Sequence, residues 1–197
     1  MIDPAIFQRR SIRAFQQAPL PREAVEQILD AAIQAPSAKN RQPWRFVVVQ
    51  DSAKQGMLEA MRQGIRREAS GEALLKDSAR FLKGAEYTLQ IMGQAPVTIF
   101  VLYPEGGSVL ENISGEKRLY QSADLQSIGA AIQNMALAAT GLGLGSLWNC
   151  DVYFAYQELL EWLETKDQLV AAMSFGYPAQ SPLARPRKKR ETVTQWL

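Results

Sequence analysis

The sequence predicts one α+β domain over residues 1–197, with roughly four strands and five or six helices. Three observations support this fold class. Residues 44–50 and 96–103 are rich in β-branched and aromatic side chains, which is typical of strands. Residues 122–141 have the length of a helix and are apolar on nearly every side, so this helix should be buried. The segments also lack the regular strand–helix alternation of a Rossmann chain.

Local signals predict where the helices begin and end. Helices start at N-caps or with proline in their first turn, and they stop before proline. Asp3-Pro4 and Pro21 are such starts, and Pro36 is such an end. Ser52 with Gln55 matches a capping box. The expected helices span residues 4–9, 21–35, 52–64, 122–141 and 153–164.

The remaining segments predict strands, turns and one long loop. Besides the two strands above, a strand is expected at residues 168–175. The glycines of 141–145 should turn the chain into Ser146-Leu147-Trp148. Residues 65–93 are helical in character, with expected breaks at Gly71 and Gly84. Residues 104–121 have no clear periodicity and predict a long, mobile loop that covers a site.

Missing residue types limit the chemistry that side chains alone could perform. The chain contains no histidine and a single cysteine, Cys150. This composition excludes Ser-His and Cys-His nucleophilic catalysis, an intrachain disulfide and a multi-cysteine zinc site. Without a histidine partner, Cys150 is expected to be a small buried residue and not a nucleophile. An enzyme of this composition would depend on an organic cofactor, and a non-enzymatic protein remains open at this point.

Charge and hydropathy give expectations about location and partners. The net charge of +2 is too small to indicate a nucleic acid or a membrane as partner. No uninterrupted apolar stretch is long enough to span a bilayer, and no secretory signal precedes Arg9 and Arg10. A lone cysteine suits a reducing compartment. We therefore expect a cytoplasmic protein without a membrane partner.

Three arginines and a serine gather near the start of the chain. Arg9, Arg10, Ser11 and Arg13 place three guanidiniums and a hydroxyl within five residues. Guanidinium groups match phosphate oxygens in pairs, and a serine hydroxyl adds a donor. A cationic helix end is the other interpretation, because cations stabilise helix C-termini. A second segment is needed to decide between the two.

That second segment comprises residues 36–44, Pro-Ser-Ala-Lys-Asn-Arg-Gln-Pro-Trp. Taken alone, it reads as a helix-to-strand loop with ordinary turn residues. Together with residues 9–13, however, it resembles the two amino-terminal flavin-binding segments of the nitroreductase family. Residues 124–134 and the glycines of 141–145 are similar to that family's central helix and the turn after it. The resemblance covers about residues 5–195.

The basic residues 185–190 have three interpretations. Alone, they predict a solvated tail or a nucleic-acid patch. In the order Gly176-Tyr177-Pro178, then 185–188, then Glu191, they resemble the family's carboxy-terminal segment, whose basic residues return to the flavin phosphate. Arg187 is the best match and Arg185 the next.

The resemblance implies an FMN enzyme that folds as a nitroreductase-like sandwich, with a mainly antiparallel central sheet flanked by helices. It also implies an intertwined homodimer, NAD(P)H as the reductant and a small-molecule acceptor such as a nitroaromatic or a quinone, used in a ping-pong mechanism. Four groups of residues are implied to bind FMN: Arg9, Arg10, Ser11, Arg185 and Arg187 at the phosphate and ribityl end; Arg13 near the pyrimidine edge; Pro36, Ser37, Ala38 and Asn40 from the other subunit; and Ser146, Leu147, Trp148 and Asn149 along the ring.

The resemblance names no catalytic side chain and leaves alternatives open. Trp148-Asn149-Cys150 stands where many family members have a glycine, a departure that concerns the local flavin contacts and the substrate preference. The same fold also hosts dehydrogenation, reductive dehalogenation and flavin fragmentation. A non-enzymatic nucleic-acid-binding module that uses the basic tail is the more distant alternative.

Overall fold

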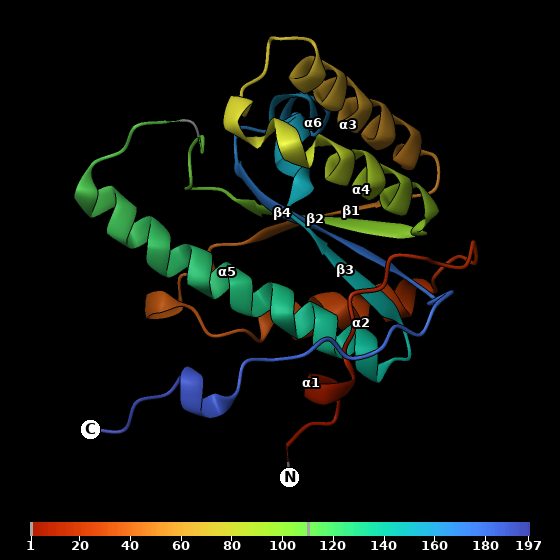
Figure 1. Cartoon of the computed structure of the whole chain (residues 1–197), viewed down its shortest axis with the longest axis vertical. Helices are drawn as coiled ribbons and strands as arrows, with labels where there is room; N and C mark the ends of the chain where they lie inside the picture. The colour runs from red at the N-terminus through yellow and green to blue at the C-terminus, as the bar shows by residue number, and fades with distance from the viewer. Residues whose placement is uncertain (1, 110) are drawn as a thin grey trace.

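In the computed structural model, which describes residues 2–109 and 111–197, helices cover both faces of one sheet (Figure 1). The α-helices are α1 (Ala5–Gln8), α2 (Arg22–Ile33), α3 (Ala53–Ala69), α4 (Leu82–Gln94), α5 (Gly115–Gly141) and α6 (Tyr156–Trp162). The short 3-10 helices are η1 (Ala38–Asn40), η2 (Lys76–Phe81), η3 (Asp151–Ala155) and η4 (Arg190–Thr192).

The sheet is antiparallel throughout. Its strands are β1 (Arg45–Gln50), β2 (Val97–Tyr103), β3 (Gly145–Asn149) and β4 (Gln168–Gly176), in the order β1-β2-β4-β3. Every residue of β2 is buried, because this inner strand has helices over both of its faces. β3 lies at an edge, so one side of its backbone faces away from the sheet. The predicted α+β fold with a mainly antiparallel sheet is confirmed.

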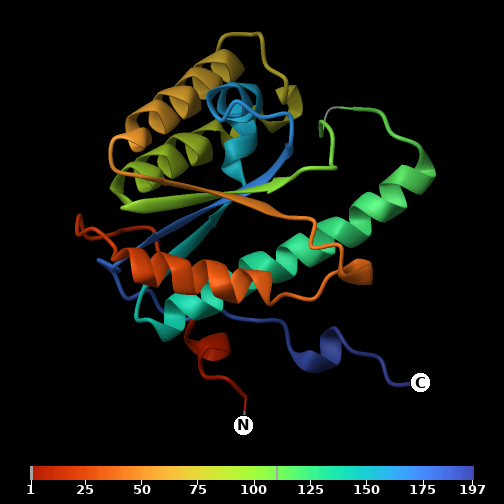
Figure 2. The same ribbon diagram turned by 180° about the vertical axis from the view of Figure 1, so that it is seen from behind.

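Each face of the sheet carries its own hydrophobic core. α2 and α5 cover one face, where Ile28, Ile132 and Phe175 are fully buried. α3, α4 and α6 cover the other face, where Met57 and Phe100 are fully buried, and Figure 2 shows the two layers from behind. Burying each such side chain contributes roughly 1.5–3 kcal/mol. The sheet is therefore held between two layers of helices.

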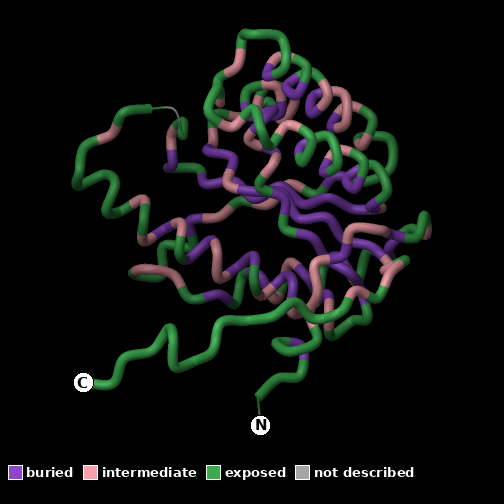
Figure 3. The backbone as a smooth tube through the Cα atoms, viewed as in Figure 1, coloured by how far each residue is buried: buried purple, intermediate pink, exposed green. Residues whose placement is uncertain are grey.

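The long helix α5 begins earlier than the sequence pattern predicts. It starts at Gly115, where the side chain of Ser114 accepts a hydrogen bond of 3.2 Å from the backbone N–H of Lys117. The prediction of a loop over residues 104–121 is therefore wrong from residue 115 onward. The first turns of α5 extend beyond the sheet and are exposed (Figure 3), with Leu119 at 74% exposure. Because no buried face lies there, the sequence has no apolar periodicity to reveal the helix.

Three further boundaries differ from the predictions. The helix expected at 52–64 continues to Ala69, and Ser52 makes no side-chain cap hydrogen bond. Gly71 has a positive φ of 94° and ends the segment as predicted, whereas Gly84 lies inside α4. The cost of a glycine in a helix is about 1 kcal/mol, which the buried side chains of α4 outweigh. The last expected helix is divided into η3 and α6.

Among the described residues, none of the helices combines the length and the apolar character needed to cross a bilayer.

Candidate functional site

Arginines from distant parts of the sequence line one pocket. This pocket has a volume of about 240 Å³ and is lined by Arg9, Arg10, Ser11, Arg13, Pro182, Leu183, Arg185 and Arg187. We call it the arginine pocket. It contains every residue that the sequence analysis placed at the phosphate, and Arg13 as well.

Backbone hydrogen bonds explain why these segments meet. The N–H of Ile12 donates to the carbonyl of Ser146 on β3 (2.9 Å), and the N–H of Ala179 donates to the carbonyl of Ala14 (2.9 Å). Residues 11–16 therefore lie between the outer edge of β3, which they bridge at Ser146, and the segment that follows β4. The approach to β3 is close, since a Cβ added at Gly145 would lie 2.8 Å from the Cγ1 of Ile12. Glycine is needed there for this packing.

The five guanidiniums of the arginine pocket lack anionic partners. Within the described ranges, none of them has a carboxylate within 4.0 Å. In the part of the chain that the structure describes, Arg10 donates to two backbone carbonyls, those of Phe7 (2.7 Å) and Arg9 (2.9 Å). Guanidinium groups without carboxylates around one small pocket favour an anion with several oxygens, such as a phosphate.

The edge strand β3 offers backbone and one large side chain to the site. Ser146, Leu147 and Asn149 are buried, whereas Trp148 is 43% exposed. The carbonyl of Ser146 faces the outer edge, where it accepts from Ile12. Backbone groups alternate in direction along an antiparallel strand, so the N–H and carbonyl of Trp148 face the same outer edge. Of the four predicted ring contacts, the side chain of Trp148 is the most accessible.

The loop of residues 36–42 has an unusual backbone. Lys39, Asn40 and Gln42 have positive φ angles of 53°, 55° and 49°. This left-handed region costs residues such as Lys39 and Gln42 roughly 1 kcal/mol or more each, and asparagine less. Part of the cost is offset by hydrogen bonds, because the hydroxyl of Ser37 accepts from the backbone N–H of Gln42 (3.0 Å). The N–H of Ala38 donates to the hydroxyl of Ser127 on α5 (3.3 Å).

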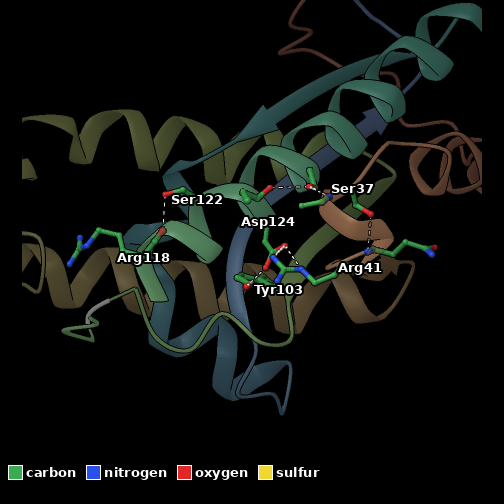
Figure 4. A network of polar contacts seen from close by, with 10 residues as sticks. Ser37, Arg41, Tyr103, Arg118, Ser122 and Asp124 are labelled. Carbon is green, nitrogen blue, oxygen red and sulfur yellow. Dashed lines mark hydrogen bonds and ion pairs between the residues drawn. The ribbon is translucent and has the colours of Figure 1, made fainter. Parts of the chain in front are cut away.

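A buried carboxylate fixes the same loop to the body of the protein (Figure 4). Asp124 on α5 accepts two hydrogen bonds on one oxygen from Arg41, from Nε at 3.1 Å and Nη2 at 2.5 Å. Its other oxygen accepts from the hydroxyl of Tyr103 at 2.6 Å. Burial and this hydrogen bond raise the pKa of Tyr103 far above its usual value. The hydrogen bond to Asp124 likewise raises the pKa of Arg41.

Sequence reasoning missed the roles of Arg41, Tyr103 and Asp124. The available signal was a single aspartate in the apolar part of a helix, since a buried carboxylate needs a partner. Which residue would be that partner depends on how α5, β2 and the loop pack together.

Within one chain, the loop and the arginine pocket are separate. Pro36, Ser37, Ala38 and Asn40 are absent from the lining of the arginine pocket. Pro36 and Asn40 are exposed, and both views show η1 beside the middle of α5 and away from α1 (Figures 1 and 2). The structure therefore brings the arginines and β3 together but leaves the loop apart from them.

A second, largely apolar pocket lies just beyond the end of β3. Its volume is about 430 Å³, and it is lined by Leu74, Leu75, Ser78, Phe81, Val109, Cys150, Asp151, Tyr153, Phe154 and Tyr156. Cys150 is exposed here, so the expectation that it is buried is wrong. Partial desolvation and the charge of Asp151 raise the pKa of its thiol, which keeps it protonated and a poor nucleophile.

Comparisons with known proteins agree on one family for this chain. The profile of the Nitroreductase family matches residues 6–177. A protein of Methanothermobacter thermautotrophicus, named NADH dehydrogenase/NAD(P)H nitroreductase, is 32% identical over 92% of this chain and 79% of its own length. The 5,6-dimethylbenzimidazole synthase of Rhodospirillum rubrum is 34% identical over 73% of this chain and 66% of its own length.

The fold agrees as well. A nitroreductase-type protein from Desulfovibrio desulfuricans, crystallised in complex with FMN, superposes with a TM-score of 0.72 at 30% identity. That match covers 98% of this chain and 95% of the other. FMN is also the cofactor that the sequence analysis expects. The chain thus belongs to the nitroreductase family.

Proposed function

We propose that this protein is an FMN-dependent oxidoreductase that uses NADH or NADPH to reduce nitroaromatics, quinones or related acceptors in a ping-pong mechanism. The observation that carries the proposal is the arginine pocket, where five guanidiniums have no carboxylate partner among the described residues and where Ser11 bridges to Ser146 of the edge strand β3. The FMN-bound structure from Desulfovibrio desulfuricans supports the choice of cofactor.

The residues of the arginine pocket fit the phosphate of FMN. A phosphate monoester carries between one and two negative charges near neutral pH, and several guanidiniums can bind its oxygens at once. Arg9, Arg10, Ser11 and Arg187 would hold the phosphate and ribityl end, with Arg185 next to them. Arg13 would lie toward the pyrimidine edge, where a cation stabilises the negative charge of reduced flavin.

When bound, FMN would supply the redox chemistry by accepting hydride from NAD(P)H and passing electrons to the second substrate. The protein's own task is then to bind, orient and exclude water. The outward-facing backbone of Trp148 would position the ring along β3, together with Ser146, Leu147 and Asn149. A chain without histidine is compatible with these roles, because the proposed chemistry requires no acid–base side chain from the protein.

We further propose that the functional unit is an intertwined homodimer. The loop residues Pro36, Ser37, Ala38 and Asn40 would contact the FMN bound mainly by the other subunit. Their separation from the arginine pocket within one chain supports this arrangement. Large apolar side chains are also left exposed: Leu119, Leu183, Val193 and Trp196. Such surface is typical of a protein–protein interface.

The apolar pocket beyond the end of β3 favours an uncharged aromatic molecule as the electron acceptor. Phe81, Tyr153 and Tyr156 provide aromatic surface, and Asp151 would disfavour an anionic acceptor at the same place.

A single exposed thiol suits a reducing compartment, and we propose the cytoplasm as the location.

Spectroscopy on the purified protein tests the proposal directly. The protein should be yellow, absorb at about 450 nm as oxidised flavins do, and bleach when NADH or NADPH is added without air. Adding a quinone or a nitroaromatic should restore the colour. A colourless protein that FMN does not reconstitute would contradict the proposed function.

A flavin-fragmenting activity is the second candidate, because the chain is similar to the 5,6-dimethylbenzimidazole synthase of Rhodospirillum rubrum. Incubation with FMN, NAD(P)H and oxygen would distinguish the two activities. Steady loss of FMN with formation of a benzimidazole favours fragmentation, whereas turnover of the acceptor with FMN intact favours the first proposal.

The convergence of Arg185 and Arg187 on one pocket favours a small anion over a nucleic acid as their partner.

A further inference from the structure

We propose that Asp124 is a positioning residue for the loop that faces the flavin of the partner subunit. Through Arg41, it holds the loop of residues 37–42, with left-handed backbone at Lys39, Asn40 and Gln42, in the conformation from which Ser37, Ala38 and Asn40 would contact the cofactor. This inference rests on the proposed function, since it assumes bound FMN and a homodimer.

Among the described residues, the contacts of Asp124 link the loop to the body of the protein. Its carboxylate is 2% exposed, and both oxygens are engaged, one by Arg41 and the other by Tyr103. α5 and β2 are anchored in a hydrophobic core, so Asp124 and Tyr103 form a fixed base. Arg41 is the loop residue bound to that base, and its own side chain is 32% exposed. Asp124 therefore acts on the loop through Arg41 (Figure 4).

The loop needs such a tether because of its backbone. Lys39, Asn40 and Gln42 all have positive φ, and none of them is a glycine. Without a tether, these residues would relax toward negative φ, and the peptide groups around Ala38 would turn with them. Ser127 provides a second tie one turn along α5, by accepting the N–H of Ala38. The conformation of the loop is therefore imposed by α5.

The chain offers a matched control on the other face of the sheet. Glu158 on α6 accepts two hydrogen bonds from Arg67, at 2.7 and 3.3 Å, and its side chain is 15% exposed. Glu158→Gln and Asp124→Asn remove the same charge from a two-point arginine pair. Only Asp124 is connected to the loop.

Titration of FMN, followed by flavin fluorescence, tests the role of Asp124. Asp124→Asn should raise the Kd for FMN roughly tenfold, which is the effect of letting one or two left-handed residues relax. Glu158→Gln should leave the Kd within about twofold of wild type, because it alters only stability. Equal losses in the two variants, or an unchanged Kd in Asp124→Asn, would overturn the inference.

A glycine rescue separates positioning from a general structural effect. Glycine adopts positive φ without strain, so Lys39→Gly added to Asp124→Asn should recover about half of the lost affinity on a logarithmic scale. Glu164 also has a positive φ, of 51°, but lies far along the chain in another loop. Glu164→Gly in the same background should recover nothing. Rescue by both glycines or by neither contradicts the proposal.

Two safeguards keep the outcomes distinct. If Asp124→Asn does not fold, Arg41→Gln carries the same test and the same expected loss, since it removes the loop's side of the pair. If the wild-type protein does not bind FMN, the proposed function fails. If the wild type binds FMN and Asp124→Asn binds it equally well, the proposed role of Asp124 is refuted, but the proposed function is not.

Discussion

Arg9 and Arg41 both belong to predicted flavin-binding segments, yet only Arg41 has a carboxylate partner. Arg9 lies in the arginine pocket, where none of the five guanidiniums meets a carboxylate in the described part of the chain. Arg41 is bound by Asp124 at two points. The difference shows two uses of the same side chain: an unpaired arginine is available to a ligand, and a paired one holds the backbone in place.

The largest expected effect comes from removing the unpaired charges. Arg9→Ala with Arg187→Ala should raise the Kd for FMN about 100-fold or more, because two charge-assisted hydrogen bonds are worth roughly 3 kcal/mol together. The fold should be retained, as circular dichroism would show. Lys188→Ala with Arg190→Ala removes equal charge from the same tail outside the pocket. If this control loses as much affinity, net charge and not the pocket binds FMN.

Breaking either of the two paired arginines should also lower the stability of the protein. Asp124→Asn and Glu158→Gln should each lower the free energy of unfolding by about 2 kcal/mol, the value of hydrogen bonds to a charged group. For a chain of this length, that corresponds to a fall in Tm of about 4–8 °C. Thermal unfolding without FMN measures both variants. No change in stability for Asp124→Asn would mean that the pair contributes little to the fold.

Tyr103 tests the second contact of Asp124. Tyr103→Phe should cost about 1 kcal/mol, because it removes one hydrogen bond and leaves the ring in place. The raised pKa of Tyr103 stabilises the protein fully below its unfolded pKa of about 10, and that stability is lost as the pH rises beyond it. Urea unfolding at pH 8 and above pH 10 should therefore show a smaller decline for Tyr103→Phe than for wild type. Equal declines would contradict this assignment.

The smallest effect concerns salt. Raising the ionic strength from about 0.05 to 0.5 M should weaken FMN binding by wild type about threefold, because salt screens the attraction between the guanidiniums and the phosphate. The variant with Arg9→Ala and Arg187→Ala should show a flatter dependence. Titrations at both salt concentrations measure the difference, and parallel slopes would indicate that these arginines do not face the anion.

The sequence predicted those parts of the molecule that have a local signature. β2 is a continuous apolar run, and the structure buries all of it. The two arginine-containing segments, 9–13 and 185–187, could be picked out because each has a recognisable composition. That they lie near each other was expected from the resemblance to the family, and both line the arginine pocket. Trp148 was also named, although nothing in the sequence showed that its side chain is more exposed than those of Ser146, Leu147 and Asn149.

Other parts had no local signature. The first turns of α5 lack a buried face, so their sequence does not look helical. The pair of Arg41 with Asp124 joins residues far apart in the chain, and its existence depends on the docking of α5 against β2 and the loop. The left-handed angles of Lys39 and Gln42 are equally hidden, since neither residue type favours them.

The arginine pocket also has a consequence for the order of events during synthesis. Its cations come from residues 9–13 and 185–187, so the early segment leaves the ribosome long before the late one. At a typical rate of about 5–20 residues per second, the two are separated by roughly ten seconds or more. A nascent chain that has not reached residue 185 can therefore present only part of the arginine pocket. Under the proposed function, full capture of FMN therefore follows the emergence of residue 187 from the ribosome.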